Sequence, residues 1–144
     1  MLTARRVQWL AFFGVLAAVM PFIAWFALRF WSLFAYAQEQ HAMRDLVEQL
    51  PNRRPPGVSV AAWDVATGWA ITACGNVCFS EGYVPIDELR RFRVDVEKRL
   101  KAEVDLTTID WIWQRLGETG PHGQQYRKRF EPEYREGLKS IMVR

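Results

Sequence analysis

The two cysteines are the residues of this sequence whose type and spacing come closest to a chemical site. Cys74 and Cys78 form a Cys-x-x-x-Cys pair, one residue longer than the Cys-x-x-Cys spacing of redox and zinc-binding motifs. Residues four apart share one face of a helix, so the two thiolates could bind a metal together with two histidines. The chain offers His41 and His122 for that role. A thiol or metal-binding module is therefore one hypothesis for the function.

A disulfide between Cys74 and Cys78 needs a turn at the intervening Gly75 and Asn76. Bridging requires Cα atoms within about 7 Å and Cβ atoms aimed at each other, and an extracytoplasmic location favours it. Without the turn, both cysteines are expected to be small apolar residues of the core.

Other arrangements that could support catalysis are not evident in the sequence. His122 lies in a Gly-Pro-His-Gly turn, with no Ser, Cys or carboxylate at a spacing that implies a catalytic triad. The close acidic pairs, Asp105 with Asp110 and Glu131 with Glu133, are not separated as an acid and base across a cleft would be. Glycine-rich phosphate-binding loops are also missing. We expect no enzymatic activity, no cofactor, no bound metal and no small-molecule substrate.

The net charge of +3 comes from the N-terminal segment. Arg5, Arg6 and Arg29 lie within the first 37 residues, which contain no acidic residue. The rest of the chain holds equal numbers of basic and acidic side chains, and its basic clusters are interleaved with acids. A basic domain that binds nucleic-acid phosphates is therefore not expected.

The segment from Val7 to Leu28 carries no charged residue and, as a helix rising about 1.5 Å per residue, reaches roughly 33 Å. That length spans the hydrocarbon core of a bilayer. Trp9 near one end and Trp25 and Trp31 near the other suit the aromatic belts of membrane interfaces. The sequence predicts a transmembrane helix in contact with the lipid bilayer.

A cleaved signal peptide is the alternative, because Arg5 and Arg6 resemble its basic region and residues 35–37 read Ala-Tyr-Ala. The apolar stretch is about twice the 7 to 15 residues typical of such peptides, which favours an uncleaved signal-anchor. Arginines stand on both sides of the span, so their distribution gives little guidance on orientation. The short N-terminal tail favours an extracytoplasmic C-terminal domain.

Three regions follow along the chain. Residues 1–37 form the predicted anchor, and residues 38–57 a juxtamembrane helix followed by a linker. Three prolines between Pro51 and Pro56 favour an extended and fairly stiff linker. Residues 58–144 are predicted to form a small helical domain.

The predicted fold is all-α, with the anchor followed by a domain of about four to five helices. Apolar residues recur three and four apart along its segments, and no segment alternates as a strand does. Ser59, Pro85 and Thr107 mark predicted helix starts, and Pro132 is expected to divide the last segment into two short helices. The expected buried stripes are Trp63, Ala66, Ala70, Ala73, Cys74 and Val77; Ile86, Leu89, Phe92, Val96, Leu100 and Val104; Ile109, Ile112, Trp113 and Leu116; and Tyr126, Phe130, Tyr134, Leu138 and Ile141.

Two tryptophans are candidate interface residues. Trp111 lies opposite the predicted buried stripe of its helix, and Trp69 flanks a stripe of small residues. Tryptophan is enriched among the residues that dominate protein–protein binding. The sequence thus favours a single-pass membrane scaffold, adaptor or accessory subunit that contacts another membrane or membrane-associated protein. The alternative is a membrane-tethered thiol or metal-binding module that uses Cys74 and Cys78.

Overall fold

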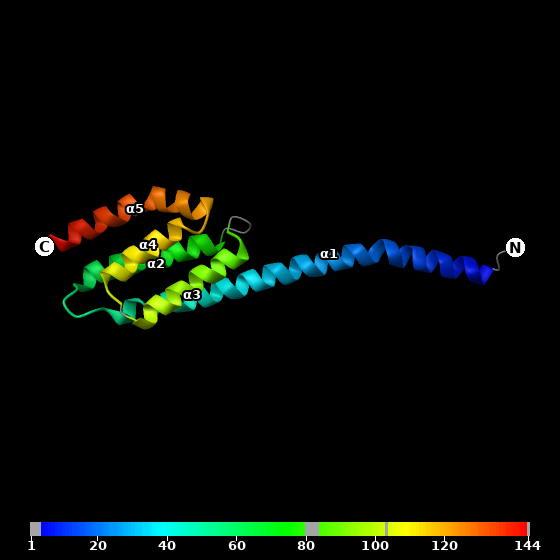
Figure 1. The fold of residues 1–144 in the computed structure, drawn as a ribbon, viewed down its shortest axis with the longest axis horizontal. Helices are drawn as coiled ribbons and strands as arrows, with labels where there is room; N and C mark the ends of the chain where they lie inside the picture. The colour runs from blue at the N-terminus through cyan, green and yellow to red at the C-terminus, as the bar shows by residue number, and fades with distance from the viewer. Residues whose placement is uncertain (1–3, 80–83, 103, 144) are drawn as a thin grey trace. The chain divides into compact units, whose positions relative to one another are not determined.

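The computed structural model describes residues 4–79, 84–102 and 104–143, with the backbone alone for residues 4–7, 10–11 and 76–79. In these ranges the chain is all-α, as predicted, with five α-helices, one short 3-10 helix and no strand (Figure 1). The elements are α1 (Ala4–Val47), η1 (Pro51–Arg53), α2 (Val60–Phe79), α3 (Ile86–Ala102), α4 (Leu106–Gly117) and α5 (Pro121–Met142).

The chain divides into two compact units, residues 1–37 and 38–144. The helical unit begins earlier than the predicted domain, which started at Val58. The reason is that the last turns of α1, residues 38–47, contribute Met43 and Val47 to the core, both at most 1% exposed. We call these turns the distal segment of α1. What was predicted to be a juxtamembrane helix is therefore part of the folded helical unit.

The proline-rich segment after α1 is bridged by a buried hydrogen bond. The indole Nε1–H of Trp63, in α2, donates to the backbone carbonyl of Leu50 over 2.9 Å. Both side chains are fully buried. Between them, Pro51–Arg53 forms the 3-10 turn η1 rather than a fully extended linker. The linker thus folds back, and α2 packs against η1.

The buried faces of α2, α3 and α4 confirm the predicted helical periodicity. Each helix buries a stripe with spacings of three and four, because such residues share one face. Ser59 caps α2 as expected, since its Oγ accepts a hydrogen bond from the Ala62 amide. The cap of α4 differs from the prediction. Asp105 replaces Thr107 as the N-cap and exchanges hydrogen bonds with Thr108 in a capping box.

The expected break at Pro132 is wrong, because α5 runs without interruption from Pro121 to Met142. Proline lacks an N–H, so one backbone hydrogen bond of the helix is lost there. Ion pairs span the site: Glu131 accepts from Arg127, one turn before, and from Arg135, one turn after. These contacts and the packing of α5 on α2 and α4 hold the helix together across the proline.

Aromatic rings form the centre of the core where α2, α4 and α5 meet. Trp113, fully buried in α4, stacks against Tyr134 with ring centroids 5.1 Å apart and against Tyr126 at 6.2 Å. Phe130 packs on Tyr126 at 4.6 Å, and Trp69 of α2 completes the group. We call these five residues the aromatic cluster. It joins α2 to the consecutive helices α4 and α5, and such aromatic pairs add stability beyond that of area burial.

Gly123 is required where the first turn of α5 crosses the end of α4. A Cβ atom at this position would lie 2.2 Å from the Leu116 carbonyl oxygen and 2.3 Å from Thr119 Oγ1. Real Cβ atoms do not come that close, so any side chain would force the two helices apart. Gly137 in the same helix is different, because its added Cβ would meet only Val65 Cγ1, at an ordinary 3.5 Å.

These two glycines give a matched test of the fold. We expect Gly123→Ala to destabilise the helical unit by about 2 kcal/mol or more, since overpacking there shifts backbone. Gly137→Ala should stabilise it by about 0.5 to 1 kcal/mol, because alanine has the higher helix propensity. Denaturant unfolding of the full chain in detergent measures both. Equal effects of the two substitutions would contradict the described α4–α5 crossing.

Candidate functional site

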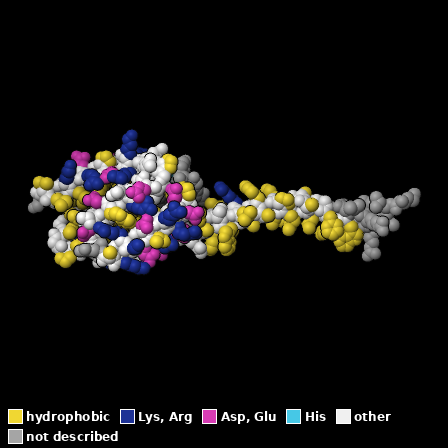
Figure 2. All heavy atoms as spheres, in the orientation of Figure 1, with side chains coloured by type: hydrophobic (Ala, Val, Ile, Leu, Met, Phe, Trp, Pro, Cys, Tyr) yellow, Lys and Arg dark blue, Asp and Glu magenta, His cyan; other side chains and the backbone are white. Residues whose placement is uncertain are grey.

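The first candidate site is the exposed apolar surface of α1. Every side chain from residue 12 to residue 34 is exposed, among them Trp25 at 60% and Trp31 at 71%. We call this stretch the apolar segment. In Figure 2 the side chains of this helix are mostly hydrophobic, with a single basic group among them, whereas charges of both signs are spread over the visible face of the helical unit. A core helix of a soluble protein buries such residues. In α1, none of the most apolar stretch is buried. Among the described helices, α1 is long and apolar enough to cross a membrane.

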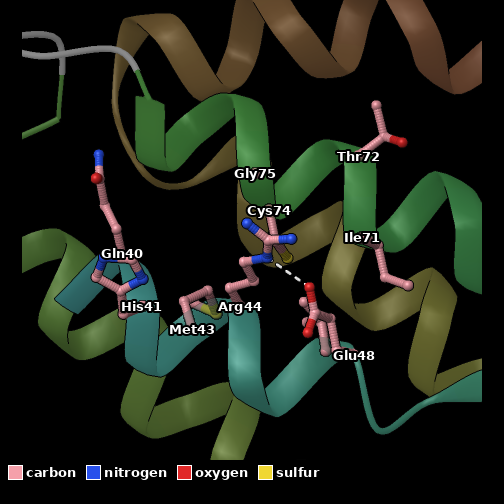
Figure 3. Close-up of a pocket in the computed structure, with 10 residues that line it drawn as sticks. Gln40, His41, Met43, Arg44, Glu48, Ile71, Thr72, Cys74 and Gly75 are labelled. Atoms are coloured by element: carbon pink, nitrogen blue, oxygen red, sulfur yellow. Dashed lines mark hydrogen bonds and ion pairs between the residues drawn. The ribbon is translucent and has the colours of Figure 1, made fainter. Parts of the chain in front are cut away.

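The second candidate site is a groove in the helical unit, between the distal segment of α1 and α2 (Figure 3). Its volume is about 420 Å³. Met43 on α1 and Cys74 on α2 face the same space and form its floor, together with Val47. The remaining lining residues stand around them: Gln40, His41, Arg44, Glu48, Ile71, Thr72 and Gly75. We call this space the α1–α2 groove.

Small residues on α2 explain why the groove exists. Where α2 lines the groove, it contributes the small residues Cys74 and Gly75 beside Ile71 and Thr72. Packed helix axes normally lie 8 to 10 Å apart, with side chains filling the space between them. Small side chains leave part of this space open.

The groove carries an ion pair on one edge. Arg44 Nε donates to Glu48 Oε1 one helical turn later, and the two side chains are 62% and 46% exposed. Such an exposed pair contributes only about 0.3 to 0.5 kcal/mol to stability. Both charged groups are therefore available to another ligand at little cost in stability.

Glu39 ties the distal segment of α1 to α3. Its carboxylate accepts hydrogen bonds from Arg90 Nε, at 3.0 Å, and from Arg93 Nε. The Glu39 side chain is only 13% exposed. Burial raises the pKa of Glu39, but the hydrogen bonds and charges of the two arginines lower it further, so the pKa lies below its ordinary value of 4.5. The ion pairs of Glu39 with Arg90 and Arg93 thus hold the distal segment of α1, which lines the α1–α2 groove, against α3.

The structure describes only one side chain of the predicted cysteine pair, that of Cys74. Cys74 is fully buried at the groove floor. The helix α2 continues through Gly75 and Asn76, so the turn that a disulfide was expected to need does not form. The Cys78 side chain lies outside the described residues. In the part of the chain whose side chains are described, no three His, Cys, Asp or Glu residues come together to hold a metal ion.

The two predicted interface tryptophans differ in their surroundings. Trp69 is half-buried and packs on Trp113 and Phe130, with ring centroids 6.4 and 6.1 Å apart, so it belongs to the aromatic cluster. Trp111 is half-buried on the face of α4 that also carries the exposed Asp110. Asp110 lies within 3.5 Å of Arg135, so α5 covers one side of this face. Trp111 therefore keeps part of its surface on the outside of the unit.

The sequence analysis did not predict the α1–α2 groove. It also did not predict the ion pairs of Glu39 with Arg90 and Arg93, which we call the Glu39 tie. Met43, Leu46, Val47 and Leu50 recur at helical spacing, which predicted a juxtamembrane helix, but the prolines that follow suggested that this helix is separated from the domain by a linker. Glu39 lies more than fifty positions from its arginine partners, which leaves no local pattern to find.

Comparison with protein families, curated proteins and solved structures finds no match to this chain. The features that bear on function are therefore the exposed apolar segment, the α1–α2 groove and the surface of the helical unit.

The Glu39 tie predicts a pH dependence. The pKa of Glu39 is lower in the folded chain than in the unfolded chain, so the stabilisation is fully present above about pH 4.5. It is lost as the pH falls through the lower folded-state pKa. We expect Glu39→Gln to lower the free energy of unfolding at pH 7 by about 1 to 3 kcal/mol and to make its decline below pH 4.5 shallower.

Glu48→Gln is the matched control, because it removes an acid of the same helix whose ion pair is exposed. Other acids titrate in all three proteins, so the difference between the curves isolates Glu39. Equal pH curves for Glu39→Gln and Glu48→Gln, measured by denaturant unfolding in detergent, would show that the Glu39 tie does not stabilise the fold.

Proposed function

We propose that this protein is a single-pass membrane adaptor or accessory subunit: α1 anchors it in the bilayer, and its helical unit contacts another membrane or membrane-associated protein. The observation that carries the proposal is the complete exposure of the apolar segment, residues 12–34. Leaving many aromatic and aliphatic side chains in water forgoes on the order of 2 kcal/mol each. A lipid environment removes that cost.

The described geometry also suits a signal-anchor rather than a removable leader. The helix continues past the Ala35–Ala37 site into the distal segment, whose Met43 and Val47 belong to the core. The apolar stretch before this site is also longer than the about 7 to 15 residues of a signal peptide.

Contact with a partner protein is proposed through the Trp111 face of α4. A half-buried tryptophan beside the exposed polar residues Asp110 and Gln114 combines apolar area with a polar surround, as binding surfaces do. Trp69 is not proposed for this role, because its ring packs within the aromatic cluster.

Alkaline carbonate extraction of membranes from expressing cells tests the anchor. We expect the full chain to stay in the membrane pellet with its N-terminus intact by mass. Val19→Arg combined with Phe26→Arg should release it, since each charge at the centre of a span costs about 2.5 to 3.5 kcal/mol. Val60→Arg combined with Val94→Arg is the control, because those exposed valines lie in the helical unit. Wild-type chain in the supernatant, or a mature chain beginning at Gln38, would refute the anchor.

Trp111→Ala tests whether the Trp111 face of α4 binds a partner protein. We expect it to change the free energy of unfolding by no more than about 1 kcal/mol, whereas Trp113→Ala, in the buried cluster, costs about 3 to 5 kcal/mol. On native gels of mildly solubilised membranes, Trp111→Ala should lose a complex that the wild-type chain forms. A complex that survives Trp111→Ala, or a loss of stability equal to that of Trp113→Ala, would rule out the docking role.

A further inference from the structure

We propose that the α1–α2 groove binds one acyl chain of a membrane phospholipid, with the headgroup held at Arg44 and Glu48. The proposal rests on the proposed function, because the membrane supplies the lipid. It goes beyond that function by assigning a ligand site within the helical unit.

The groove has the size and lining of a lipid chain site. Its volume of about 420 Å³ lies in the range of small-molecule pockets, roughly 300 to 1,000 Å³. Polar side chains line part of the groove: Gln40, His41, Arg44, Glu48 and Thr72. Its apolar lining residues are Met43 and Val47 of α1 and Ile71 and Cys74 of α2. A strongly polar ligand would lose its hydrogen bonds to water against these groups, whereas an apolar chain would not. The flexible thioether of Met43 can also adapt to a chain of variable shape.

The position of the groove in the chain brings it close to a source of lipid. Gln40, its first lining residue, follows Phe34, the last residue of the apolar segment, after a few residues. A chain reaches at most about 3.5 Å per residue, so the two residues lie within about 20 Å of each other in any arrangement. That distance is less than the thickness of a bilayer, about 30 Å for the hydrocarbon core alone.

The charges at the edge of the groove match a zwitterionic headgroup. Arg44 and Glu48 stand one helical turn apart, and phosphatidylethanolamine carries a phosphate and an ammonium group linked by a short chain. Arginine binds phosphate oxygens through charge-assisted hydrogen bonds, and the Glu48 carboxylate can accept from the ammonium. Their mutual ion pair is exposed and weak, so giving it up for contacts with the headgroup costs little.

Photolabelling of the full chain in vesicles tests the site. The probe is a phosphatidylethanolamine that carries a diazirine on one acyl chain, and labelled peptides are identified by mass spectrometry. We expect adducts on residues 40–48 and 71–75, in addition to adducts on residues 12–34. Cys74→Phe should reduce the groove adducts by about tenfold, because a larger side chain fills the space. Ala61→Phe, at an exposed position of the same helix, should leave them unchanged.

Adducts on residues 12–34 serve as an internal control in every sample. Labelling of the apolar segment without labelling of the groove overturns the lipid site and leaves the membrane anchor intact. No labelling of either region refutes the anchor itself. Gly75→Leu, which fills the groove from a neighbouring position, is the second variant if Cys74→Phe lowers the helical content. Groove adducts that survive both substitutions would come from the outer surface, which also overturns the proposal.

Two further measurements identify the occupant. Arg44→Gln with Glu48→Gln should weaken labelling by the phosphatidylethanolamine probe, but not by a diazirine-bearing diacylglycerol, which has the acyl chains and no charged headgroup. Equal loss with both probes overturns the headgroup assignment. A photoreactive phenylalanine at position 71, activated in native membranes, should gain the mass of a phospholipid. A cross-link to a second copy or to another protein there would show that a protein segment occupies the groove.

Discussion

The packing of Trp113 is the interaction on which the helical unit most depends. Its ring stacks with Tyr126 and Tyr134 of α5 and packs against Trp69 of α2. A unit of about a hundred residues buries a limited apolar area, so a few large rings supply much of its stability. The close approach at Gly123 follows from the same contact, since α5 must cross α4 tightly for its tyrosines to reach Trp113. Through these rings the last helix of the chain is held on the second and fourth.

The periodic parts of the fold could be predicted from the sequence, because each buried stripe lies within one helix. Leu89, Phe92 and Val96 of α3 are an example, and all three are fully buried. Features that depend on which of several neighbouring residues makes a given contact were harder to predict from the sequence. Thr107 and Asp105 can both cap α4, and the choice is made by the Thr108 side chain that completes the capping box. At Pro132 the local rule for proline was overridden by ion pairs and packing that lie outside any short window.

The candidate sites divide in the same way. A site that lies in one continuous stretch could be predicted, and a site formed by distant segments could not. The apolar segment was evident because membrane spans are defined by composition over a continuous stretch. The α1–α2 groove was not, because it arises where small residues of one helix stand opposite another that is distant in sequence. Trp69 illustrates the limit for single residues. Its position beside a stripe of small residues suggested an outer surface, but the arrangement of α5 decides that its ring faces Phe130.

The hydrogen bond from Trp63 to Leu50 has a consequence for the order in which the chain folds. It joins residues only 13 positions apart, and the entropy lost in closing a loop grows with the length of that loop. Contacts between α2 and α5 close much longer loops. The corner formed by the distal segment of α1, η1 and the start of α2 can therefore assemble on its own, early, as a local nucleus. On this view the proline-rich turn forms early and gives α2 its first packing partner. The aromatic rings of α5 pack against α2 later.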